Sequence, residues 1–158
     1  MPFTPLHLGP GALLKGVGGE RFSFMVFGGS QLLMDIEPAY RMIVQNPIIH
    51  GWTHTLAGAA TIGLIATFSG KPASEFVLRL LRYPRPTMAW SAAVAGAYAG
   101  TFSHVFFDAI MHSDMMPWSP LSESNRILGL MSIGSLHITC VSLGLVGAVL
   151  FFVNHRQD

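Results

Sequence analysis

The segment HVFFDAIMHSD, residues 104–114, places His104, Asp108 and His112 at intervals of four within an apolar stretch. Residues four apart lie on one face of an α-helix, one turn above another. An imidazole or a carboxylate in apolar surroundings costs free energy unless it is hydrogen-bonded or bound to an ion. The pattern therefore predicts a helix with one polar face that serves as a binding site.

Further histidines and acidic residues stand at the ends of other apolar stretches, in the segments MDIEP and HGWTH. Histidine nitrogens and carboxylate oxygens, without a thiolate, suit Zn²⁺ and also Mn²⁺ or Fe²⁺. We therefore expect one or two divalent ions, with Zn²⁺ as the first choice. The candidate ligands are His7, Asp35, His50, His54, His104 and Asp108. The choice between His50 and His54 as ligand of the first ion stays open.

Glu37 and His112 are the candidate catalytic residues. His112 lies two helical turns from His104, too far along the axis to share its ion. It is assigned to a second ion, to hydrogen bonding around the ligands, or to the substrate. Glu37, or a carboxylate oxygen of Asp35, is expected to orient or deprotonate the attacking water. A bound ion would lower the pKa of that water toward about 7 and polarise a phosphoryl oxygen.

Five apolar segments, separated by Gly, Pro and charged residues, must position these side chains. They span residues 5–18, 22–37, 52–70, 88–112 and 127–153. The last two reach the roughly 20 residues needed to cross a bilayer, and the first two are shorter. No strand-like alternation is present. We expect one all-α domain, residues 1–158: a membrane-embedded bundle of about five apolar helices, with GAYAG (Gly96, Gly100) as a close-packing face.

The segment SEFVLRLLRY, residues 74–83, joins two of these apolar segments. It groups apolar side chains with arginines beside them, which predicts a separate, short amphipathic helix at the membrane surface. A solvated loop is the alternative.

Composition supports a membrane protein. Charged residues make up 11 % of the chain and hydrophobic residues 51 %, against about 25 % and 45–50 % in ordinary soluble domains. The net charge of +1 gives no sign of a nucleic-acid partner. The single Cys140 excludes an internal disulfide and a cysteine metal site. The N-terminal residues lack the basic region of a secretory signal peptide.

Basic residues predict the orientation in a bacterial-type inner membrane. If the N-terminus lies outside and every segment crosses, seven basic residues fall on the inner side and two on the outer side. The inner residues are Lys15, Arg21, Lys71, Arg79, Arg82, Arg85 and Arg156, and the outer ones are Arg41 and Arg126. This arrangement brings all the candidate ligands to the outer side.

The motifs MPFTPLH, MDIEP, HGWTHT and HVFFDAIMHSD, in this order, resemble the predicted membrane-bound metal-dependent hydrolases, the YdjM-like inner-membrane family. The pattern is more distantly similar to the zinc-dependent phospholipase C and P1 nuclease group, all-helical enzymes that cleave phosphoesters with clustered zinc ions. That likeness implies ligand roles for His7, Asp35, His50 or His54, His104, Asp108 and His112. The chain departs from that group at its Met-Pro-Phe start and at Val141, four residues after His137, which favours one or two ions over three.

These observations predict a metal-dependent hydrolase at the membrane interface, acting on a lipid or lipid-linked phosphoester. Its partners would be membrane lipids. The loop at residues 113–126 carries Met115, Met116 and Trp118, which suit an interface where such a substrate enters. The alternative is a non-catalytic protein that binds or transports metal. Conduction would need polar residues through the bilayer, and inward of the site we find only His137, Thr139 and scattered serines.

Overall fold

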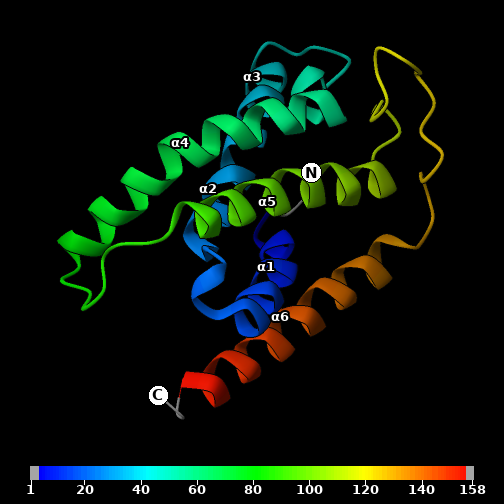
Figure 1. Ribbon diagram of the computed structural model, residues 1–158. Helices are drawn as coiled ribbons and strands as arrows, with labels where there is room; N and C mark the ends of the chain where they lie inside the picture. The colour runs from blue at the N-terminus through cyan, green and yellow to red at the C-terminus, as the bar shows by residue number, and fades with distance from the viewer. Residues whose placement is uncertain (1–3, 156–158) are drawn as a thin grey trace.

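The computed structural model describes residues 4–155, which form helices and loops without a strand (Figure 1). The all-α prediction is therefore confirmed. The α-helices are α1 (Thr4–Gly18), α2 (Phe24–Met34), α3 (Ile36–Ile43), α4 (Leu56–Leu80), α5 (Trp90–Met111) and α6 (Ile133–His155). Two 3-10 turns cover Gly19–Arg21 and Trp52–His54. Arg156 and the first three residues of MPFTPLH lie outside the described residues.

Three expected boundaries differ in the structure. The segment 22–37 is not one helix, because α2 ends at Met34 and α3 begins after Asp35. The segment 74–83 does not form a separate helix, because α4 runs unbroken to Leu80. Glu75 pairs with Lys71 and Arg79, one turn to either side, and such pairs stabilise a continuous helix. The last helix begins at Ile133, not at residue 127. The hydroxyl of Ser132 accepts the backbone N–H of Ser135 there, an N-terminal cap.

Glycines bring the helices into close contact. On α5, a Cβ at Gly96 would overlap the backbone oxygen of Ser23, and one at Gly100 would overlap the hydroxyl of Ser30. The GAYAG face therefore packs directly against α2, as the sequence predicts. This contact holds α2, which ends beside Asp35, at a fixed distance from the helix that carries His104 and Asp108.

Helix α6 lies along α1 at the edge of the bundle (Figure 1). Gly9 of α1 meets the backbone of Cys140, and Gly147 of α6 meets the backbone of Ala12. The side-chain amide of Asn154 donates to the carbonyl of Gly16 at 3.0 Å. The pair places His7, near the start of α1, against the side of α5.

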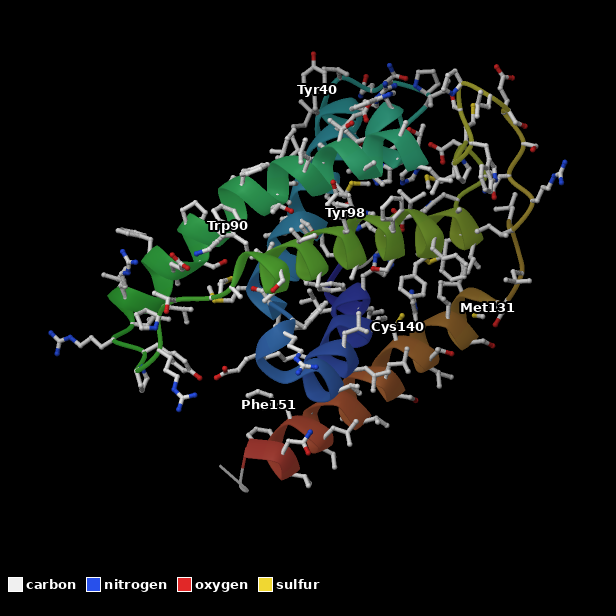
Figure 2. The ribbon with its side chains drawn as sticks, viewed as in Figure 1. Tyr40, Trp90, Tyr98, Met131, Cys140 and Phe151 are labelled. Carbon is white, nitrogen blue, oxygen red and sulfur yellow. The ribbon has the colours of Figure 1, made fainter. Side chains whose placement is uncertain are left out.

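One helix within the described residues is long and apolar enough to cross a membrane, Ile133–Asn154 of α6. Only 17 % of this stretch is buried in the protein, and Figure 2 shows side chains along the side of α6 that faces away from the bundle. The whole surface is also large. It measures 9372 Å², whereas a compact soluble protein of 17.1 kDa exposes roughly 7,800 Å². The bundle is open and leaves many apolar side chains uncovered.

Candidate metal centre

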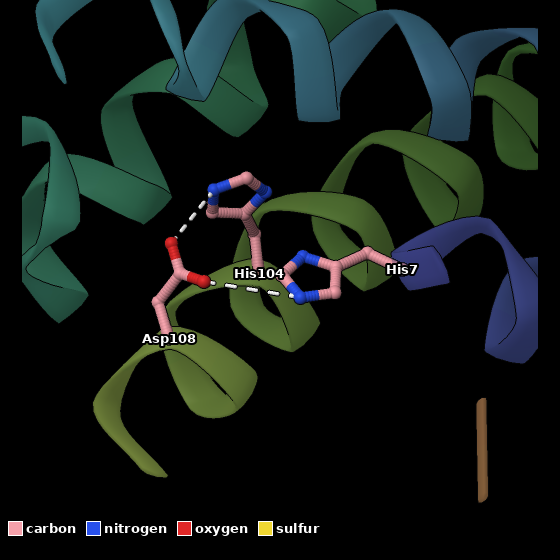
Figure 3. A group of neighbouring side chains, drawn as sticks. All are labelled: His7, His104 and Asp108. Atoms are coloured by element: carbon pink, nitrogen blue, oxygen red, sulfur yellow. Dashed lines mark ion pairs between the residues drawn. The ribbon is translucent and has the colours of Figure 1, made fainter. Parts of the chain in front are cut away.

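The carboxylate of Asp108 lies at the centre of a buried group of histidines. Asp108 and His104 are fully buried, one turn apart on α5. The Oδ2 atom of Asp108 is 3.1 Å from Nε2 of His104 and 3.5 Å from Nε2 of His54. Oδ1 points to a different ring and lies 3.8 Å from Nε2 of His7. Figure 3 shows His104 beside one oxygen of this carboxylate and His7 beside the other.

Three more predicted residues border the same group. Asp35, at the junction of α2 and α3, places Oδ1 3.3 Å from Nε2 of His104. Nε2 of His50 lies 4.0 Å from Oδ2 of Asp108. The ring of His112, just after α5, packs against that of His50 with centroids 4.4 Å apart and the ring planes tilted by 32°. The predicted ligands therefore converge, although they come from four separate parts of the chain.

Several polar atoms of this group are buried without a hydrogen-bond partner among residues 4–155. They are Nδ1 of His7, Nε2 of His54, His104 and His112, and both carboxylate oxygens of Asp108. Unpaired buried polar atoms are rare in folded proteins because each one costs about 1–3 kcal/mol. Their concentration at one point fits a bound cation.

The other ring nitrogen of His104 is held by residues outside the predicted set. Its Nδ1 contacts Oε1 of the buried Gln31. The amide nitrogen of Gln31 donates to the hydroxyl of Ser103, whose own hydrogen goes to the carbonyl of Gly100. These hydrogen bonds orient the amide oxygen toward His104, so Nδ1 carries a hydrogen, and in the neutral ring Nε2 then keeps a lone pair.

In His50 and His54, as in His104, a neighbouring oxygen accepts the hydrogen of Nδ1. Nδ1 of His50 lies 2.9 Å from Oδ1 of Asp114, and a carboxylate can only accept. Nδ1 of His54 lies 3.0 Å from the hydroxyl of Thr53, which donates its hydrogen to Glu37. All three rings therefore donate outward from Nδ1 and turn a bare Nε2 toward Asp108. Histidines that bind metals are held in this way.

The ligand atoms form three overlapping groups in which all atoms lie within 4.8 Å of one another. They are His7, His104 and Asp108; Asp35, His54 and His104; and His50, Asp108 and His112. A single Nε2 binds one ion, so the first two groups compete for His104. The second and third groups share no residue. The donor set can therefore hold one ion between Asp35, His54 and His104 and another between His50, Asp108 and His112.

The sequence left open whether His50 or His54 is a ligand, and the structure brings both to the centre, one in each non-overlapping group. His112 joins His50, in line with the second-ion option. Glu37 does not contact the candidate ligands directly. Its carboxylate oxygens contact Arg41 and Thr53, and Thr53 lies between Glu37 and His54. Met115 is buried in the core, not at the surface as expected, whereas Trp118 is exposed.

Gln31, Thr53 and Asp114 are residues that sequence reasoning missed. A glutamine inside the apolar segment 22–37 was a possible signal for the first, and the acidic end of HVFFDAIMHSD for the last. Burial opposes the charged form of Asp114, but hydrogen bonds from the backbone and ring of His50 and from the N–H of Ile49 outweigh it. Its pKa is lowered to about 2, so Asp114 is a carboxylate at neutral pH.

Comparisons of this protein with family models, with curated proteins and with solved structures gave no match. The likeness to the metal-dependent hydrolases therefore stays a prediction from the motifs, and the candidate site rests on its own geometry.

Proposed function

We propose that this protein is a membrane-embedded, metal-dependent hydrolase that cleaves a lipid or lipid-linked phosphoester. One observation carries the proposal: three imidazoles turn bare Nε2 atoms toward a buried carboxylate that has no hydrogen-bond partner among residues 4–155. Lone pairs that face one another repel, and a divalent cation relieves this repulsion. The absence of thiolate ligands favours Zn²⁺, with Mn²⁺ or Fe²⁺ as further options.

The buried residues would serve as metal ligands, and one of them would also orient water. Asp35, His54 and His104 would hold one ion, and Asp108 with His50 or His7 a second. When bound, such an ion supplies Lewis acidity toward a phosphoryl oxygen and acidifies water. The side chain of Asp35 is 26 % exposed, whereas that of Asp108 is fully buried. Asp35 is therefore the carboxylate of the group best placed to orient a water that arrives from outside.

The membrane assignment is supported by the distribution of polar side chains. Helix α6 is apolar and mostly uncovered, as a lipid-facing helix would be. On α5 the polar residues His104 and Asp108 turn inward, while Phe102 and Phe106 are exposed. Intramembrane ionisable residues mark functional sites. Together with the seven-to-two basic bias, these features support a multi-pass inner-membrane protein whose site opens to the outer face.

The test combines metal analysis with a substrate screen on the purified full-length chain in detergent. We expect bound Zn²⁺ or Mn²⁺, with release of phosphocholine from vesicles of phosphatidylcholine or of inorganic phosphate from vesicles that contain phosphatidic acid. His112→Ala should keep at least one ion and reduce turnover, and His137→Ala on α6 serves as the matched control. A wild-type protein that neither contains nor takes up a divalent metal would contradict the proposal.

A metal-binding or transport protein is the second candidate. It is favoured by the same bare nitrogens, because these explain metal binding without chemistry. The two candidates differ in the screen: a binder would contain metal, lose at least one ion on Asp108→Asn, and yet cleave none of the phosphoesters tested.

A further inference from the structure

We infer that Glu37 is a positioning residue, which acts through Thr53 to fix the orientation and tautomer of His54. The inference rests on the proposed metal site and gives Glu37 a role other than deprotonating water. It follows from three contacts: Arg41 to Glu37, Glu37 to Thr53, and Thr53 to His54.

Both oxygens of Glu37 are engaged away from the metal group. Oε1 accepts from Nε of Arg41 at 2.8 Å and lies 2.7 Å from Nη2 of the same guanidinium. Oε2 accepts the backbone N–H of Thr53 at 2.8 Å and its hydroxyl at 2.6 Å. Four donor contacts stabilise the ionised carboxylate and hold it in one orientation.

The direction of these hydrogen bonds determines the state of His54. The hydroxyl of Thr53 has one hydrogen, and Glu37 receives it. The hydroxyl oxygen can therefore only accept from Nδ1 of His54, 3.0 Å away. With its hydrogen on Nδ1, His54 presents a lone pair at Nε2, the atom 3.5 Å from Asp108.

The loop before α4 is shaped around the same carboxylate. A Cβ at Gly51 would collide with Oε1 of Glu37 and with the guanidinium of Arg41. Arg41 also donates to the carbonyl of Ile48 at 3.3 Å. Helix α3 therefore holds the loop that carries His50 and His54, which gives this short helix a place in the site although it supplies no ligand.

The experiment measures Zn²⁺ affinity by chelator competition on the purified full-length protein. Thr53→Val keeps the shape of the side chain and leaves Glu37 paired with Arg41, but removes the hydroxyl that reaches His54. We expect Thr53→Val and Glu37→Gln each to weaken Zn²⁺ binding by about tenfold to a hundredfold. The double variant should lose little more than either single one, because both remove the same connection. Thr53→Ser should restore affinity.

Thr61→Val is the matched control, since Thr61 lies on α4 and its hydroxyl bonds to its own helix at Ala57. If Glu37 instead deprotonates water, Glu37→Gln would lower kcat with unchanged Zn²⁺ affinity, and Thr53→Val would change neither. That result would overturn the inference and leave the proposed hydrolase standing.

A second measurement does not depend on metal or turnover. Two-bond ¹H–¹⁵N spectra of histidine-labelled, metal-free protein should report His54 with its hydrogen on Nδ1 in the wild type and a mixed population in Thr53→Val. A wild-type His54 with its hydrogen on Nε2 would contradict the inference directly.

Discussion

Nε2 of His104 and Oδ2 of Asp108 lie 3.1 Å apart on successive turns of α5, fully buried, and neither atom has a hydrogen-bond partner among residues 4–155. The reason is the tautomer: Gln31 holds the ring hydrogen of His104 on the opposite nitrogen. With a neutral His104 ring, two acceptors face each other in a dry interior, and a bound cation relieves their repulsion.

Asp108→Asn should release at least one bound ion. The substitution keeps the shape of the side chain but removes the negative charge that faces His7, His54 and His104. Metal content measured by mass spectrometry should fall by at least one ion per chain, because Asp108 belongs to two of the three ligand groups. His137→Ala should retain its metal. Normal metal content in Asp108→Asn would show that Asp108 is not a ligand.

Gln31→Leu should weaken metal binding without any change in charge. The variant removes the acceptor that keeps the hydrogen of His104 on Nδ1 and leaves the size of the side chain nearly unchanged. We expect Zn²⁺ affinity to fall by about tenfold to a hundredfold, with Thr139→Val on the exposed face of α6 as the control. Equal affinity in wild type and Gln31→Leu would show that His104 needs no such partner.

Gly96→Ala and Gly134→Ala should change stability in opposite directions. A Cβ at Gly96 overlaps a backbone oxygen of α2, so α2 and α5 must separate, at a cost of about 1–3 kcal/mol. Gly134, in the first turn of α6, has open space around it, and alanine there should stabilise by up to about 1 kcal/mol. Thermal unfolding followed by circular dichroism measures both. A Gly96→Ala protein as stable as the wild type would refute the close contact.

Acid should remove the contribution of Glu75 to stability. Hydrogen bonds from Lys71 and from the backbone N–H of Met88 lower the pKa of this carboxyl below its ordinary value of 4.5. A lowered pKa in the folded state contributes stability above pH 4.5 that is lost as the pH falls through the folded-state pKa. The Tm difference between wild type and Glu75→Gln should therefore be present at pH 6 and shrink below pH 4.5. A Tm difference of the same size at pH 6 and at pH 3 would contradict this prediction.

Reporter fusions test the orientation. Fusions within residues 71–86 should report the cytoplasm and those within 113–126 the outer side, because basic residues concentrate at the former. The reverse pattern would place the metal group on the cytoplasmic side and exclude a substrate in the outer leaflet.

The sequence alone determined the helical class and the composition of the candidate site. Intervals of four put His104 and Asp108 on one helix face whatever surrounds that helix, and the apolar flanks exclude a solvated surface for them. The glycines of GAYAG likewise predicted a close contact that the structure contains. These are local properties, which spacing and residue type express directly.

The tertiary structure decided which ring nitrogen of each candidate histidine is free to bind a metal ion. The partner of His104 is Gln31, 73 residues away, and that of His50 is Asp114, 64 residues away. It also placed the carboxylate of Glu37 against Thr53 and Arg41, and brought both His50 and His54 to the centre. Each outcome depends on which side chains from distant segments bond to the Nδ1 atoms of the histidine rings. The spacing of residues along the sequence does not predict these long-range partners.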